Sequence, residues 1–197
     1  MAKPRQAQWQ HRIEMANKTR QHPPLGWPLT CRILGILRSQ SLHPMTASPF
    51  MLKALNIASL AMRMTSPNPR VGCVIVNGQG KILGQGHTQK AGGLHAERVA
   101  LQDAADQGNS VEGATAYVTL EPCAHHGRTA PCCDALIKAK IGKVVAALSD
   151  PNPLVAGQGI DRLKAAGIVV EVGDGAHLAE QQNLGFLSRM RRHKPWV

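Results

Sequence analysis

The stretch His95-Ala96-Glu97 is followed further along the chain by Glu121-Pro122-Cys123 and by a second cysteine, Cys132. One imidazole and two thiolates are ligands that zinc commonly takes in proteins, and three such ligands leave a fourth coordination position open. A water molecule in that position has its pKa lowered from about 15.7 towards about 7, which makes it a nucleophile at neutral pH. We therefore expect His95, Cys123 and Cys132 to bind Zn²⁺.

Glu97 lies two residues after His95, so it can sit beside the metal without binding it. A carboxylate in that place can take a proton from the water and pass protons to a ring nitrogen and to leaving ammonia. His-x-Glu followed by Pro-Cys is the pattern of zinc deaminases, in which the Glu is not a ligand. Taken singly, these residues could be an ordinary histidine, a solvated carboxylate and two small buried hydrophobic side chains. Their order and combination indicate instead that Glu97 is a catalytic proton shuttle.

The chain of 197 residues is long enough for one domain with a sizeable core. Hydrophobic residues make up 43% of it but aromatic residues only 3%, so the core is expected to be aliphatic. Five cysteines without a recognisable signal peptide favour a reducing, cytoplasmic location over a disulfide framework. No stretch of the sequence approaches the ~20 apolar residues of a membrane span, so we expect no membrane partner.

The net charge of +11 suggests a nucleic-acid partner until its distribution is considered. Residues 1–50 carry seven Lys or Arg and one acidic residue, and residues 186–197 carry four Lys or Arg and no acidic residue. The segment between them is therefore nearly neutral. Because a basic tail is more often a solvated end than a nucleic-acid reader, we do not expect a nucleic-acid partner. A nucleic-acid or nucleotide base deaminase remains an alternative, supported only by the basic ends.

Residues 1–48 form a basic, proline-containing extension without clear periodicity, which we expect to be disordered. The pattern changes at Ser48, a candidate N-cap that precedes Pro49 at the first helical position. Residues 49–197 are then expected to form the zinc-dependent deaminase domain.

Within this domain, helices and strands alternate, and a turn at Asn77-Gly78-Gln79-Gly80 joins the first two strands as a hairpin. Later strands are separated by helices, which favours parallel crossovers. The sequence therefore predicts an α/β fold, a three-layer α/β/α sandwich around a mixed five-stranded sheet. The expected helices are 49–64, 95–106, 131–140, 157–166 and 176–192, and the expected strands are 71–77, 81–86, 114–120, 143–148 and 168–172.

Several motifs together resemble the pyrimidine deaminase of riboflavin biosynthesis, a member of the cytidine deaminase-like superfamily. The resemblance covers residues 50–197. The discriminating feature is the insert of eight residues between Cys123 and Cys132, because tRNA adenosine and guanine deaminases typically carry Pro-Cys-x-x-Cys. The motifs are Pro67-Asn68-Pro69-x-Val71-Gly72, His95-Ala96-Glu97, Glu121-Pro122-Cys123-Ala124-His125-His126-Gly127-Arg128-Thr129-x-Pro131-Cys132-Cys133, Asp150-Pro151-Asn152-Pro153 and Gly157-x-Gly159.

The resemblance implies a zinc hydrolase that deaminates the diaminohydroxyphosphoribosylaminopyrimidine intermediate to the aminouracil phosphate. It also implies that Asn68, His125 and Arg128 contact the substrate. An Asn amide can bond a ring amide edge as donor and acceptor, and Arg128 with Thr129 can grip a phosphate. The alternatives are that Asn68 only caps a turn between two prolines and that Arg128 is a solvated loop charge.

The sequence departs from the family pattern in two places. Thr88 occupies a position where the family commonly has a histidine, and His87 precedes it. In addition, Asn183–Met190 resembles the helix that leads into an NADPH-dependent reductase domain in fused relatives, yet no dinucleotide fingerprint is present. We therefore expect no reductase activity, a separate protein for the reductase step and, as in relatives, a homo-oligomer. An inactive zinc-holding partner of that reductase is a further alternative, which the intact Glu97 disfavours.

Overall fold

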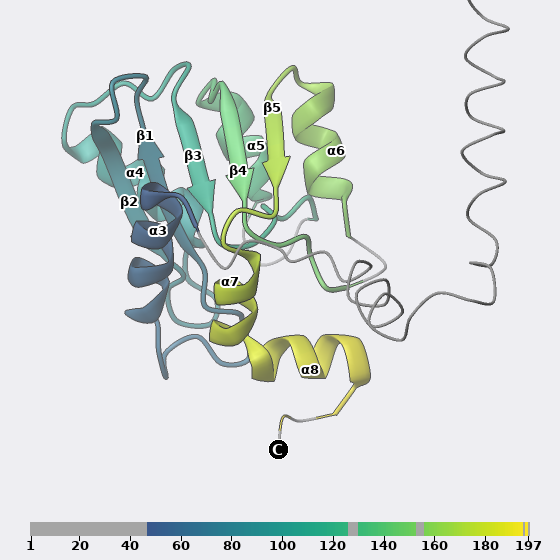
Figure 1. The fold of residues 1–197 in the computed structure, drawn as a ribbon. Helices are drawn as coiled ribbons and strands as arrows, with labels where there is room; N and C mark the ends of the chain where they lie inside the picture. Colours follow the sequence, from purple (N-terminus) through teal and green to yellow (C-terminus); the bar gives the residue numbers. More distant parts are fainter. Residues whose placement is uncertain (1–46, 126–129, 153–155, 195, 197) are drawn as a thin grey trace, which may run out of the picture. The chain divides into compact units, whose positions relative to one another are not determined.

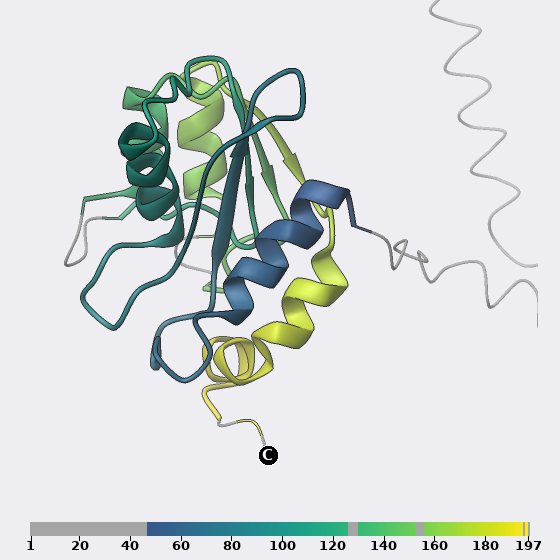
Figure 2. The same ribbon diagram turned by 90° about the vertical axis from the view of Figure 1, so that its left-hand side faces the viewer.

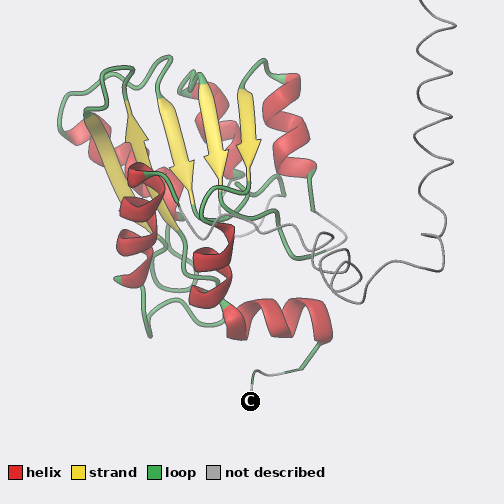
Figure 3. Ribbon diagram, in the orientation of Figure 1, coloured by secondary structure: helices red, strands yellow, loops and turns green. Residues whose placement is uncertain are grey.

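A computed structural model describes residues 47–125, 130–152, 156–194 and 196. The predicted disorder of residues 1–48 therefore falls, apart from the last two residues, outside the described part of the chain. The elements follow one another in the predicted order (Figures 1 and 3). They are α3 Pro49–Ser59, β1 Gly72–Val76, β2 Ile82–His87, α4 Ala96–Asp106, β3 Thr115–Val118, α5 Cys132–Lys138, β4 Lys143–Ala146, α6 Gln158–Ala165, β5 Val169–Val172, α7 Ala176–Gln182 and α8 Leu184–Arg192.

The five strands form one mixed sheet in the order β2-β1-β3-β4-β5. Strand β1 pairs antiparallel with β2 and β3, and β3, β4 and β5 are parallel to one another. Tyr117 at the centre of the sheet pairs with Val74 on one side and Val145 on the other. The predicted hairpin and parallel crossovers are thus confirmed, and the carboxyl ends of β3 and β4 point to the same edge of the sheet.

Helices cover both faces of the sheet, which confirms the three layers (Figure 2). Helices α4, α5 and α6 lie on one face, and α3 and α7 on the other. Glycine lets the backbones approach closely: a Cβ on Gly72 would lie 2.0 Å from the Ala54 oxygen in α3, and one on Gly84 would lie 2.3 Å from the Ala100 oxygen in α4. The core is aliphatic, as the composition predicts, and includes Met51, Val74, Ile75, Leu136, Val144 and Leu163.

Helix α3 begins where the sequence predicts. The hydroxyl of Ser48 accepts a hydrogen bond from the Met51 amide, and Pro49 occupies the first helical position. The backbone amide and hydroxyl of Ser48 also donate to the two carboxylate oxygens of Asp174, at 2.8 and 2.5 Å. The start of the domain is thereby fixed to the turn between β5 and α7.

Two predicted helices differ from the structure. Helix α3 ends at Ser59 rather than at Met64, because the chain then tightens into turns closed by bonds such as Leu60 N–H to Ile57 O. The predicted single terminal helix 176–192 is wrong: it breaks into α7 and α8 at Asn183, whose φ of −119° and ψ of 20° are not helical. No helix in the described ranges combines the length and the apolar character needed to cross a membrane.

Candidate metal and substrate site

The three predicted metal ligands come together beyond the carboxyl end of β3, at the edge of the sheet where the antiparallel strand β1 begins, although they are far apart in the sequence. His95 is the residue from which α4 begins, Cys132 opens α5, and Cys123 lies in the loop after β3 rather than at the strand's end. Their ligand atoms all lie within 4.8 Å of one another. The two helices thus direct their N-termini, which carry partial positive charge, towards the thiol sulfurs.

The distances between these atoms fit a zinc ion. The Nδ1 atom of His95 lies 3.5 Å from the Cys123 sulfur and 3.4 Å from the Cys132 sulfur. A tetrahedral zinc ion with bonds of about 2.3 Å to sulfur and about 2.0–2.1 Å to nitrogen separates such atoms by about 3.5 Å. The donor set of one imidazole and two thiols is also chemically suited to zinc.

The environment of Cys123 favours its thiolate form. Its sulfur accepts a hydrogen bond from the Cys132 backbone amide at 3.3 Å. The contact between the two thiol side chains, aided by His95, lowers the pKa of Cys123 to about 4, and the same contact raises the pKa of Cys132. The pKa of His95 is raised, chiefly by its hydrogen bond with Cys123. Before a metal binds, these three side chains therefore share protons that the metal would displace.

Glu97 lies in the first turn of α4 with only 3% of its surface exposed. Burial is the largest cause that raises its pKa to about 7. A carboxyl group with a pKa near the working pH can both accept and donate a proton, which suits general acid-base catalysis. The side chain lines the same cavity as His95 and Cys123.

This cavity has a volume of about 670 Å³, enough for a small molecule of nucleotide size. Two of the four predicted substrate-contacting residues, Asn68 and His125, line it. The other two, Arg128 and Thr129, lie outside the described residues. Cavity residues that the sequence analysis did not single out as contacts include Asp150, Asn152, Phe186 and Met190.

The position where the family pattern has a histidine is part of the cavity wall. Thr88 lines the cavity, and its buried hydroxyl accepts a hydrogen bond from the Val71 amide at 3.2 Å. His87 is not among the described residues that line the cavity, and its Nδ1 contacts the Thr88 carbonyl oxygen at 3.0 Å. At this position the described cavity wall is therefore formed by Thr88.

Glu121 has a structural role that sequence reasoning missed. Its carboxylate is 5% exposed and accepts four backbone N–H bonds. One oxygen accepts from Gly159 and Ile160 in α6, at 2.9 and 3.3 Å, and the other from Asp150 and Gly157, at 2.9 and 3.1 Å. Glu121 belongs to the Glu121-Pro122-Cys123 motif, but its bonding partners lie 29 or more residues later in the chain, and only the fold reveals them.

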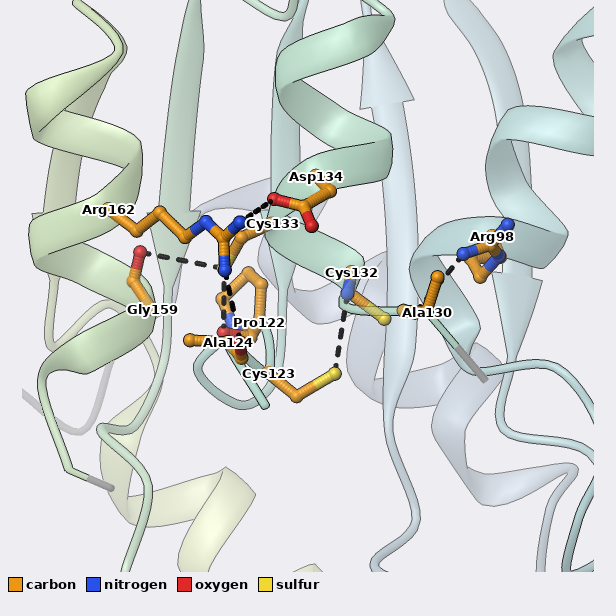
Figure 4. A network of polar contacts seen from close by, with 10 residues as sticks. All are labelled: Arg98, Pro122, Cys123, Ala124, Ala130, Cys132, Cys133, Asp134, Gly159 and Arg162. Atoms are coloured by element: carbon orange, nitrogen blue, oxygen red, sulfur yellow. Dashed lines mark hydrogen bonds and ion pairs between the residues drawn. The ribbon is translucent and has the colours of Figure 1, made fainter. Parts of the chain in front are cut away.

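The segment of Pro122 and Cys123 also contacts Cys133 of α5 and Gly159 of α6 (Figure 4). The Cys133 sulfur donates to the Pro122 oxygen at 3.1 Å and to the Gly159 oxygen at 3.5 Å. A Cβ on Gly159 would lie 2.0 Å from the Pro122 oxygen, so a glycine is required for this close approach. The segment that carries Cys123 is therefore fixed before any metal binds.

Arginines hold both ends of the eight-residue insert, residues 124–131 (Figure 4). Arg162 of α6 donates to the Ala124 oxygen at 3.2 Å and pairs with Asp134 at 2.7 Å. Arg98 of α4 donates to the Ala130 oxygen at 3.1 Å. The start and the end of the insert are thus attached to different helices.

Comparison with known proteins gives a consistent result. The family model of the cytidine and deoxycytidylate deaminase zinc-binding region matches residues 45–148. The riboflavin biosynthesis protein RibD of Escherichia coli K12 is 55% identical over 148 residues, which cover 75% of this chain and 39% of that protein.

Two solved structures have a similar fold. RibD of Acinetobacter baumannii is 52% identical with a TM-score of 0.71, over 75% of this chain and 40% of that one. The Thermotoga maritima diaminohydroxyphosphoribosylaminopyrimidine deaminase/5-amino-6-(5-phosphoribosylamino)uracil reductase is 38% identical with a TM-score of 0.72, over 75% of this chain and 42% of that one. The chain therefore spans about two fifths of the length of these relatives, and the predicted resemblance and fold class are confirmed.

Proposed function

Because this chain belongs to the family defined by the cytidine and deoxycytidylate deaminase zinc-binding region, we propose that it is a zinc-dependent pyrimidine deaminase. The proposed reaction is hydrolysis of the diaminohydroxyphosphoribosylaminopyrimidine intermediate of riboflavin biosynthesis to the aminouracil phosphate, with release of ammonia. The observation that carries the proposal is the convergence of His95, Cys123, Cys132 and Glu97 at one cavity, in a chain 55% identical to a riboflavin biosynthesis protein.

In the proposed reaction, His95, Cys123 and Cys132 would hold the zinc ion. The chemistry that zinc supplies when bound is the lowering of the pKa of a water molecule. Glu97 would accept a proton from water in the cavity and would deliver protons to the ring nitrogen and to the leaving amine. Its burial supports this role, because a carboxyl with a pKa of about 7 is not locked in one protonation state.

The other cavity residues would orient the substrate. Asn68 offers a donor and an acceptor to the amide edge of the pyrimidine, and His125 lines the cavity beside Cys123. Arg128 and Thr129 are proposed, from the sequence alone, to bind the phosphate of the ribosyl chain. We propose in addition that the protein is cytoplasmic and forms a homo-oligomer. A separate reductase would use the product.

The direct test is release of ammonia from the free riboflavin-pathway intermediate, compared with release from cytidine, deoxycytidylate, guanine and tRNA. We expect turnover of the first substrate and little of the others. Turnover of tRNA, dependent on the basic ends and steeply weakened by salt, would instead identify a nucleic-acid deaminase. Bound zinc without turnover of any substrate would identify an inactive zinc-holding partner.

Replacement of Arg128 by alanine tests the proposed phosphate contact. Charge-assisted hydrogen bonds contribute roughly 1.5–3 kcal/mol. The Arg128→Ala variant should therefore handle the phosphorylated intermediate about ten- to a hundredfold less efficiently, at about 1.4 kcal/mol per tenfold change. The measurement is kcat/KM for the phosphorylated and dephosphorylated substrates with both proteins. If both substrates suffer equally, Arg128 does not read the phosphate and instead orders its loop.

A further inference from the structure

The break between α7 and α8 is tied to the loop that carries Asn68. Asn183, at the break, is only 6% exposed. Its side-chain oxygen accepts from the Arg70 amide at 2.8 Å, and its side-chain nitrogen donates to the Arg70 oxygen at 3.0 Å and to the Ala179 oxygen at 3.3 Å. One amide thus satisfies both backbone groups of Arg70, a residue 113 positions earlier. At the same residue the backbone amide bonds to the Glu180 oxygen at 3.0 Å, and the side chain takes the Ala179 oxygen that this amide would bond in a continuous helix.

The same loop is held at its other end. Arg189, one and a half turns into α8, donates from its guanidinium to the Pro67 carbonyl oxygen. Residues 67–70 are therefore attached to the C-terminal segment on both sides of Asn68. Within the loop itself, the Asn68 amide donates to the Thr65 oxygen at 2.6 Å.

Helix α8 also borders the cavity directly. Phe186 and Met190, one turn apart, line it together with Asn68 and Glu97. The Arg189 guanidinium lies 6.0 Å from the centre of the Phe186 ring, within the range of a cation–π contact. The helix therefore contributes an apolar wall and, through Arg189, a link between this wall and the loop.

We infer that residues 183–190 are a substrate-positioning element: Asn183 and Arg189 set the place of Asn68, while Phe186 and Met190 form the apolar wall against which the pyrimidine lies. The inference rests on the proposed function for the identity of the substrate. The zinc ligands and Glu97 come from α4, α5 and the loop after β3, so a change in this element should affect substrate binding and leave the metal site intact.

Two arginines of α8 provide a matched test. Arg189 and Arg191 are both exposed, and each makes a surface hydrogen bond, but Arg191 bonds to Glu180 at 3.0 Å instead of to the loop. Arg189→Ala and Arg191→Ala remove the same charge from the same helix. We expect Arg189→Ala to raise KM about three- to tenfold, with kcat within about twofold and zinc content unchanged. Arg191→Ala should match the wild type in KM, in kcat and in zinc content.

Equal KM values for the two variants, or a fall in kcat without a rise in KM, would overturn the inference. Hydrogen exchange at residues 65–71 provides a readout that needs no substrate, and we expect faster exchange in Arg189→Ala than in Arg191→Ala. Equal exchange in both variants contradicts the positioning role even if the enzyme is active. A wild type that does not turn over the pyrimidine overturns the proposed function instead, so the two failures can be distinguished.

Discussion

The Glu97→Gln variant is expected to fold, to bind zinc as the wild type does, and to lose turnover by at least the roughly 10²–10⁴-fold typical of general acid-base catalysis. Glutamine has the shape of glutamate, so the buried site at the start of α4 can accommodate it. It cannot accept a proton from water near neutral pH, whereas burial raises the pKa of Glu97 to about 7 and allows the carboxyl group to do so.

The measurements are metal content and kcat for ammonia release. Glu112 provides the control, because its side chain is 64% exposed and it pairs only with Lys140 at the surface in the described structure. Glu112→Gln should keep wild-type turnover. If Glu97→Gln retains near wild-type turnover as well, Glu97 is not the proton shuttle. If it loses zinc, Glu97 contributes to metal binding and the division of roles must be revised.

The Cys132→Ala variant should lose its zinc, while Cys133→Ala should retain it. The two cysteines are adjacent and both buried, yet only the Cys132 sulfur approaches His95 Nδ1, at 3.4 Å. The Cys133 sulfur points to the Pro122 and Gly159 oxygens instead. Removal of a ligand thiolate leaves a two-residue site, and metal content after dialysis should fall below about a tenth of the wild-type value.

Loss of the Cys133 thiol should cost about 1–2 kcal/mol in the free energy of unfolding without displacing the metal. Zinc analysis and thermal unfolding of both variants make the comparison. The opposite result, zinc kept by Cys132→Ala and lost by Cys133→Ala, would shift the ligand assignment by one residue.

The sequence was sufficient to predict the sheet, which follows from local signals, and the grouping of His95, Cys123 and Cys132, which follows from a zinc deaminase motif. Buried strands, a hairpin turn and helix starts are encoded by neighbouring residues. Parallel crossovers then bring the carboxyl end of β3 and the N-termini of α4 and α5 to one edge of the sheet. Asn68 and His125 were named from a motif, and the cavity includes both.

The break at Asn183 was not predictable from periodicity, since Asn within a long amphipathic segment is not a strong stop signal. At the break, the Asn183 side chain bonds to Arg70, a contact that forms only in the folded domain. The role of Glu121 was hidden for the same reason, because its four donors are backbone amides of residues 150–160. The contribution of Phe186 and Met190 to the cavity follows from that break and was missed with it.

The attachment of the insert has a consequence for protein engineering and for divergence among deaminases. Arg162 and Arg98 hold Ala124 and Ala130, and the Cys133 amide donates to the Cys123 oxygen at 3.2 Å, so the described residues at both ends of the insert are anchored to the scaffold. Loop-closure free energy grows only slowly with loop length. We therefore expect a lengthened or recomposed insert that keeps these attachments to cost little stability, which would allow substrate choice to be redesigned on an unchanged scaffold.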